Sequence, residues 1–264
     1  MVARGIRSGA IRLMYNTLIY HPILQLLLWF YSVLGNNLGL AIIVLTLAIR
    51  TVLIPFTLPQ LKSAKKLASL KPELDALKKK HGHDQKLFQQ KQLEFYKAHN
   101  VNPAAGCLPF IAQFVVLIAL YQVFMNTLKG DGLSALHTSF WFWDLKVKDG
   151  TFILPVLAGI LQLITSLAIL PAVENEPEKR EGTKAQKEDV AEMAQSMQQQ
   201  MVFMMPVMTV IFALQFPSGL ALYWVITTAF SLVQQLAVSG PGGLLVYGKK
   251  IQSFLKGKTK HATN

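Results

Sequence analysis

The chain has 264 residues, of which 52% are hydrophobic and only 15% are charged, and its mean hydropathy is +0.36. This composition excludes an ordinary soluble domain and indicates a protein that crosses a membrane several times. The formal net charge is +12, and the single cysteine, Cys107, excludes an internal disulfide. We expect Cys107 to be a small buried packing residue.

The first 35 residues predict a surface-bound start to the chain. Residues 1–17 form an N-terminal extension that is rich in Arg and has no acidic residue. An organellar presequence is an alternative interpretation of this extension. Residues 18–35 are apolar, with Trp29 and Tyr31 near one end, which favours an amphipathic helix that lies on the membrane surface. A sixth membrane span is the alternative for this second segment.

Five segments are long and apolar enough to cross a bilayer core, which takes about 20 helical residues. These predicted spans are residues 38–59, 104–128, 152–171, 201–216 and 219–238. Pro217 and Gly219 separate the last two, which would otherwise form one helix too long for a bilayer. In the outer loop, residues 129–150, Trp141 and Trp143 predict an aromatic belt at the membrane interface.

The basic residues predict which loops face the cytoplasm. Residues 60–100 hold ten Lys against four acidic residues, and the tail, residues 239–264, holds five Lys and no acidic residue. The positive-inside rule therefore places both segments in the cytoplasm, and alternation places the loop at residues 172–200 there too.

Helical spacing of apolar residues in 60–100, interrupted by Pro72, predicts a basic helical hairpin of residues 62–80 and 85–99. Such a hairpin suits anionic lipid head groups or ribosomal RNA. The alternative is a solvated basic loop that only sets the topology.

Arg50 is the only charged residue in the five predicted spans, which also contain no His. A central arginine costs about 2.5–3.5 kcal/mol on insertion scales. Arg50 has no carboxylate partner in these spans, and it lies roughly 12 Å from the nearer end of its span, too deep to reach the interface easily. The pattern therefore predicts that water reaches Arg50.

Polar residues at helical spacing on other spans predict the walls of a hydrated, positively charged groove that opens to the cytoplasm. The predicted groove residues are Arg50, Thr46, Gln113, Gln162, Thr165, Ser166, Trp224, Thr227, Thr228 and Ser231. Each polar stripe taken alone suits helix–helix packing equally well. Together with the arginine, they indicate a groove that attracts acidic or polar residues of an entering chain.

A methionine stripe leads into the fourth span, because Met193, Met197, Met201, Met204 and Met208 recur every three or four residues. Methionine is flexible and polarisable, and it suits apolar surfaces that meet varied partners. We therefore predict a client-entry apolar surface formed by Met197, Met201, Met204 and Met208. Simple gap-filling between packed helices is the alternative.

Several motifs resemble those of one protein family. NPAAGCLPFIAQ (residues 102–113) and FPSGLALYW (residues 216–224) resemble signatures of the YidC-type membrane protein insertases, relatives of the mitochondrial Oxa and chloroplast Albino proteins. LTLAIRTVLIPF (residues 45–56) is similar to their first conserved span, and SLKPELDALKKKH to their cytoplasmic hairpin. The resemblance covers residues 18–238 and is to the short form without the large periplasmic domain.

The resemblance implies an all-α polytopic membrane protein. Its expected architecture is a five-span helical bundle with a hydrophilic groove, an N-terminal interfacial helix and a cytoplasmic helical hairpin. Arg50 corresponds to the family's groove arginine and Trp224 to its groove-lining tryptophan. The family's third-span glutamine has no clear match, so Thr165 or Ser166 takes its place, with Gln162 one turn away.

The implied function is that of an insertase and chaperone, which moves client proteins into the bilayer alone or with the Sec translocon. The implied partners are nascent membrane proteins, the ribosome, the Sec translocon, the signal recognition particle receptor and the lipid bilayer. The expected location is the bacterial cytoplasmic membrane, with the C-terminus in the cytoplasm. No cofactor is expected. An anion channel or small-solute transporter using Arg50 is the alternative. An enzyme is not expected, because the spans contain no acidic residue, no His and no metal-ligand spacing.

Overall fold

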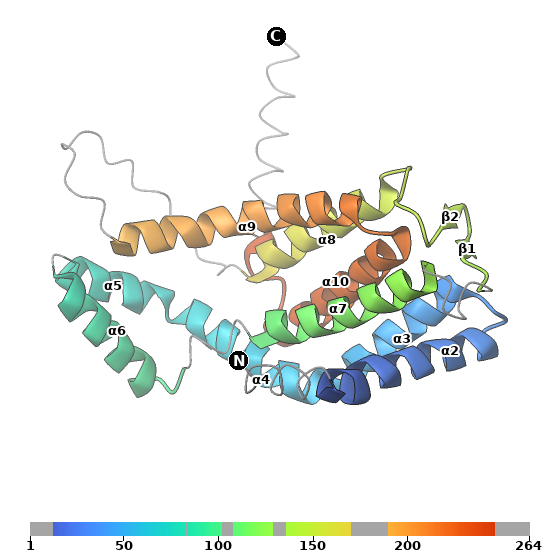
Figure 1. Ribbon diagram of the computed structural model, residues 1–264. Coiled ribbons are helices and arrows are strands. Elements are labelled where there is room, and N and C mark those ends of the chain that lie inside the picture. The colour runs from blue at the N-terminus through green and yellow to red at the C-terminus, as the bar shows by residue number, and fades with distance from the viewer. Residues whose placement is uncertain (1–12, 83, 102–107, 129–135, 170–189, 246–264) are drawn as a thin grey trace, which may run out of the picture. The chain divides into compact units, whose positions relative to one another are not determined.

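The computed structural model describes residues 13–82, 84–101, 108–128, 136–169 and 190–245, and most of these are helical (Figure 1). This agrees with the all-α prediction. Residues 1–12, Cys107, residues 172–189 of the predicted loop and residues 246–264 of the tail lie outside the described residues. The chain divides into two compact units. The first unit is Met1–Ile54, Cys107–Gly159 and Met208–Phe230, and the second is Pro55–Gly106, Ile160–Val207 and Ser231–Asn264.

The first unit begins with a π-helical turn, η1 (Asn16–Tyr20), that continues into α2 (His21–Val33). Helix α2 packs beside α3 (Leu38–Val52), as Figure 1 shows. One stripe of α2 is buried and consists of Ile23, Leu27 and Tyr31, at the four-residue spacing of a helix face. Helix α3 starts after Asn37, whose side chain accepts the Leu40 N–H at 3.0 Å and satisfies a free donor of the first turn.

The segment predicted as the first span is two helices. Helix α3 ends at Val52, and α4 (Ile54–Ser69) begins after Leu53. Pro55 accounts for the break, because proline has no N–H to donate and its ring clashes with the carbonyl four residues earlier, that of Thr51.

The described part of each other predicted span lies almost entirely on one helix. These helices are α7 (Leu108–Leu128), α8 (Ile153–Ile169), α9 (Val190–Gln215) and α10 (Ser218–Ser239). Among the described residues, α10 alone is long and apolar enough to cross a bilayer, with a second candidate if α3 and α4 count as one span. Gln113–Asn126, Ile153–Ile169 and Val202–Gln215 are shorter apolar helices. The five-span arrangement therefore stays a prediction.

A short β-hairpin lies at one end of the first unit. Strand β1 (Ser139–Phe140) pairs antiparallel with β2 (Trp143–Asp144). Gly39 of α3 lies so close to the Phe140 ring that a methyl group there would overlap it. The Ser218 hydroxyl donates to the carbonyls of Asp144 (2.6 Å) and Val147 (2.9 Å), which fixes the start of α10 to the same loop.

Asp149 organises the rest of this loop. Its carboxylate accepts hydrogen bonds from the Trp143 indole at 3.1 Å and from the backbone N–H groups of Thr151 and Leu154, both at 2.8 Å. Burial by itself would raise the pKa of Asp149, but these bonds and that of the Thr151 hydroxyl outweigh burial and lower the pKa. Trp143 is only 9% exposed, so the prediction that it belongs to an interfacial belt is wrong. Its indole N–H binds Asp149 instead.

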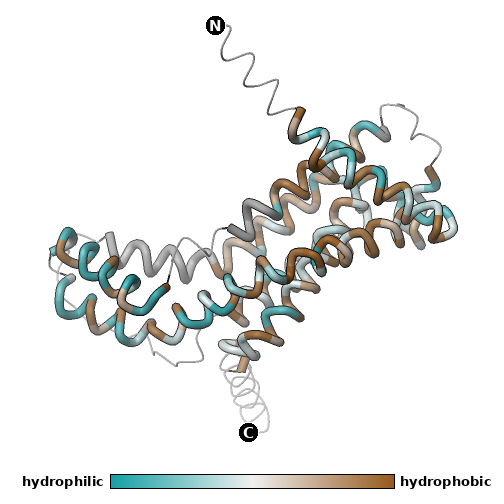
Figure 2. The backbone as a smooth tube through the Cα atoms, turned by 90° about the horizontal axis from the view of Figure 1, so that it is seen from below, coloured by the Kyte–Doolittle hydropathy of each residue, from teal (hydrophilic) through white to brown (hydrophobic). Residues whose placement is uncertain are grey.

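The second unit contains α4 and the basic hairpin of α5 (Lys71–His81) and α6 (Gln85–Ala98), which lie side by side in Figure 1. The Asp84 side chain caps α6 by accepting the N–H groups of Lys86 (3.0 Å) and Leu87 (3.1 Å). Figure 2 shows that this hairpin is mostly hydrophilic.

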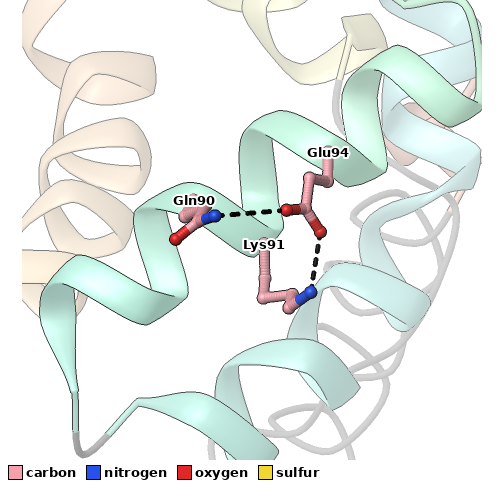
Figure 3. A network of polar contacts seen from close by, with 3 residues as sticks. All are labelled: Gln90, Lys91 and Glu94. Carbon is pink, nitrogen blue, oxygen red and sulfur yellow. Dashed lines mark hydrogen bonds and ion pairs between the residues drawn. The ribbon is translucent and has the colours of Figure 1, made fainter.

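Polar side chains of α6 bind one another at its surface. Glu94 accepts hydrogen bonds from Lys91 at 2.8 Å and Gln90 at 3.5 Å (Figure 3). The Lys91 bond lowers the pKa of Glu94. Exposed pairs of this kind add little stability, so we interpret them as part of a solvated face.

Candidate functional site

The early end of α3 changes the surroundings of Arg50. Because α3 ends at Val52, Arg50 lies in the last turn of that helix. The free carbonyls of a helix C-terminus carry a partial negative charge, which favours a nearby cation by about 0.3–1 kcal/mol. The break at Pro55 therefore offsets part of the cost of an arginine in an apolar segment.

Two neutral side chains hold the guanidinium of Arg50. Its Nε donates to Thr227 Oγ1 of α10 at 2.5 Å, and its Nη2 donates to Gln113 Oε1 of α7 at 2.5 Å. Arg50 itself is half-buried. In the described part of the chain, the ion pairs are those of Lys91 with Glu94 and of His99 with Glu73, so Arg50 has no carboxylate partner there.

Tyr223 closes this set of contacts into a ring. Gln113 Nε2 donates to the Tyr223 hydroxyl at 2.8 Å, and Tyr223 in turn hydrogen-bonds with Thr227. We call Arg50, Gln113, Tyr223 and Thr227 the arginine ring. It joins α3, α7 and α10 of the first unit, and it satisfies the cation with dipoles rather than with an opposite charge.

Tyr223 was not among the predicted groove residues, although its helical spacing from Thr227 indicated a shared face. The predicted polar stripe of α10 begins at Trp224 and does not include Tyr223. Tyr223 lies four residues before Thr227 and therefore on the same helix face. It is only 2% exposed, and a buried tyrosine hydroxyl usually needs a partner, which here is Gln113.

Three other predicted groove residues belong to the first unit. Thr46 is buried and its hydroxyl donates to the Ile42 carbonyl of its own helix at 2.6 Å. Thr228 is buried and Trp224 is half-buried. The structure therefore joins Arg50, Gln113 and Thr227 directly, whereas the lining role of the other three stays a prediction.

The remaining predicted groove residues belong to the second unit. Thr165 is buried and donates to the Leu161 carbonyl at 2.8 Å, while Gln162, Ser166 and Ser231 are half-buried. A contact that the sequence did not pair also lies in this unit: Gln234 donates to Thr57 at 2.7 Å.

The methionine stripe falls on one continuous helix, α9. Met204 and Met208 are exposed, at 52% and 38%, which leaves both available for the predicted apolar surface. Met197 and Met201 lie on α9, but their side chains are outside what the structure describes. Across the described residues, no group of three His, Cys, Asp or Glu side chains is placed to hold a metal ion.

Comparison with known proteins defines the class to which this chain belongs. A family model described as "60Kd inner membrane protein" matches residues 29–241, which include all three helices of the arginine ring. The chain belongs to this family of membrane proteins.

Its relatives carry more specific names. "Membrane protein insertase YidC 2" of Bacillus anthracis is 36% identical over 231 residues, which cover 86% of this chain and 82% of that protein. "Membrane protein insertase MisCA" of Bacillus subtilis is 33% identical over 231 residues, with 86% and 80% covered. "Membrane protein insertase YidC" of Pseudoalteromonas atlantica is 35% identical over 204 residues, which are 77% of this chain but only 33% of that longer protein. These matches confirm the resemblance to short-form YidC-type insertases that the motifs indicated.

Proposed function

We propose that this chain inserts client proteins into the bacterial cytoplasmic membrane and shields them during entry, as an insertase and chaperone. Membership of the insertase family supports the general activity. The arginine ring supports a specific part for Arg50, which is to attract acidic or polar residues of the client from the cytoplasmic side.

The observation that carries this proposal is an arginine in an apolar segment whose described partners are neutral. At an effective dielectric constant of 20, a carboxylate 4 Å from the guanidinium gains about 4 kcal/mol of Coulomb energy. An amide or hydroxyl oxygen offers no comparable attraction. An acidic residue of a client is therefore attracted to Arg50 by a Coulomb interaction that the described partners within the protein do not provide.

The proposed path is a groove among five spans, open to the cytoplasm and to lipid. Arg50, Gln113 and Thr227 are its proposed charged and polar centre. The proposed lining continues through Thr46, Gln162, Thr165, Ser166, Trp224, Thr228 and Ser231, and the exposed Met204 and Met208 support an apolar entry surface. No covalent step is needed, so the proposed activity is not enzymatic.

The proposed partners follow from charge. The hairpin of α5 and α6 and the basic tail suit ribosomal RNA and anionic lipid, and both are proposed to lie in the cytoplasm. Nascent membrane proteins delivered by ribosomes are the proposed clients. The Sec translocon and the signal recognition particle receptor are the proposed helpers.

A reconstitution tests the role of Arg50. Purified protein in liposomes receives a single-span client with an acidic translocated tail, and protease protection of the tail measures insertion. We expect strong protection with the wild type, weak protection with Arg50→Lys and none above empty liposomes with Arg50→Ala. Equal activity of all three proteins would remove Arg50 from the proposal while leaving insertase activity intact.

The same liposomes address the channel alternative. A fluorescent indicator of chloride is enclosed in them, and anion influx is followed with and without the protein. We expect no influx beyond that of empty liposomes. Influx that is lost in Arg50→Ala, without any tail protection by the wild type, would favour the anion channel instead.

A further inference from the structure

The loop that holds β1 and β2, residues 136–152, displays aromatic rings to its surroundings. Trp141 is 82% exposed, Phe142 is 62% exposed and Phe152 is 58% exposed. All three lie in the first unit, at the end where the loop meets the starts of α3, α8 and α10. We call these three residues the aromatic tip.

Two of the three tip residues have an unfavourable backbone conformation. Trp141 has φ +54° and Phe152 has φ +61°, in the left-handed region that bulky residues rarely adopt. Within the described residues, the other non-glycine residues with positive φ are Asn36 and Asn100, and asparagine tolerates this region. The strained positions without a tolerant residue are therefore two exposed aromatics, and such strain is kept where it serves a function.

Buried contacts hold the base of the loop beneath Trp141. Trp143 lies two residues after Trp141, is buried and binds Asp149. The Phe140 ring packs against Gly39 on one side and stacks with Trp141 at a centroid distance of 5.6 Å. The exposed ring of Trp141 thus rests on a packed base that is formed by Phe140 and Trp143.

We propose that the aromatic tip is an anchor that inserts into the interface of the lipid bilayer, at the boundary of head groups and acyl chains. Aromatic residues are enriched at this level of a membrane. Exposed apolar residues continue from Phe152 along the first turns of α8, through Ile153 and Val156, as expected of a lipid-facing helix.

The same loop also carries exposed charged side chains. Asp144 and Lys148 are exposed within a few residues of the tip. Exposed apolar, aromatic and charged side chains within one short segment are the mixture expected where a chain passes from the bilayer core to water. The inference requires that the chain is a membrane protein, and it does not depend on Arg50.

Tryptophan fluorescence of the full chain in proteoliposomes tests this anchor. One protein keeps Trp141 and Trp143, with Trp29 and Trp224 replaced by Phe, so that the hydrogen bond from Trp143 to Asp149 is retained and the signal of Trp141 is the difference from the control. The matched control keeps Trp143 and has Trp29, Trp141 and Trp224 replaced by Phe. Each is quenched with phospholipid brominated near the head-group end of its acyl chains, and separately with acrylamide in the buffer.

We expect brominated lipid to quench Trp141 strongly and acrylamide to quench it weakly. Trp143 should be protected from both quenchers, because it is buried in the protein. Strong acrylamide quenching of Trp141 without lipid quenching would overturn the anchor and leave the tip in water, free for a protein partner. Identical behaviour of the two tryptophans would overturn it too, because the tip would then not be distinct from its base.

Substitutions in the wild-type background test the strained conformation separately. Trp141→Gly and Trp141→Ala both remove the ring, but only glycine adopts positive φ without strain. We therefore expect Trp141→Gly to unfold at a higher temperature than Trp141→Ala in detergent. Equal melting temperatures would mean that the left-handed conformation is not held, and would overturn the argument that strain maintains the tip.

Discussion

Gln113 holds Arg50 through an amide oxygen that lies 2.5 Å from the guanidinium Nη2. The same amide donates to Tyr223 at 2.8 Å, so its orientation is fixed from both ends. This places a neutral acceptor where a carboxylate would be the stronger partner. Replacing that acceptor by a charged group of the same size is a direct test of whether the uncompensated charge of Arg50 contributes to insertion.

Gln113→Glu should therefore inhibit insertion. The new carboxylate would pair with Arg50 inside the protein and compensate the charge that attracts the client. We expect loss of protease protection for a client with an acidic tail and retention of it for an otherwise identical client with a neutral tail. Gln113→Met, of similar size but uncharged, is the control and should keep more activity on the acidic tail. Equal loss on both tails would contradict the electrostatic explanation.

Tyr223→Phe should lower stability. It removes the hydroxyl that accepts from Gln113, and a buried donor left without a partner costs about 1–3 kcal/mol. Thermal unfolding in detergent measures the loss. Tyr121→Phe is the control, since Tyr121 lies on α7 with 38% of its surface exposed. We expect a clear decrease in melting temperature for the first variant and little change for the second. Similar values for both would remove Tyr223 from the arginine ring.

Gly39→Ala should destabilise the first unit, because the added methyl group would overlap the Phe140 ring. Forcing extra volume into a packed contact costs about 1–3 kcal/mol. Adding Phe140→Leu to this variant should recover part of the loss, which a double-mutant cycle would detect.

Gly150→Ala is the control for this pair. No atom lies within 4 Å of a methyl group built at Gly150, so we expect a change of less than about 0.5 kcal/mol. Strictly additive losses for Gly39→Ala and Phe140→Leu would contradict the predicted contact.

Asp149→Asn should make stability less dependent on pH in acid. Hydrogen bonds lower the folded-state pKa of Asp149 below its value in the unfolded chain. Its contribution is therefore complete above the unfolded pKa, about 3.9, and is lost as the pH falls through the folded pKa. At pH 7 we expect the variant to be about 1–3 kcal/mol less stable, because hydrogen bonds to a charged acceptor are lost. Unfolding measured from pH 7 to pH 3 should show the difference shrinking, and a constant difference would be contrary evidence.

Helix positions and the central arginine could be predicted from sequence, because apolar runs and an isolated charge are local features. Thr227 was placed among the groove residues by helical spacing and Gln113 as a polar residue of the second span, and both contact Arg50. The break after Val52 was not predicted, although Pro55 provided the signal, because the apolar run continues through it.

The environment of aromatic residues could not be predicted from a pattern. Trp141 and Trp143 are two residues apart and were given the same role, yet one is exposed and the other is buried. What separates them is a tertiary hydrogen bond between Trp143 and Asp149, which no local spacing reveals. Tyr223 was missed for a similar reason, since its role depends on Gln113 of another helix.

The closed arginine ring also bears on how tightly a client can be held. An arriving carboxylate that approaches the Nε or Nη2 of Arg50 finds those donors already in use, because Thr227 and Gln113 accept from them. Binding is then an exchange of one hydrogen-bond acceptor for another. Release is the reverse exchange, in which the Gln113 amide oxygen accepts from Arg50 again. The carboxylate gains the Coulomb attraction of the cation but displaces a hydrogen bond to Gln113 or Thr227, so the net gain per exchange is smaller than the full interaction. Such a site favours short residence of the client over tight binding. A path that many different client chains must leave requires this property.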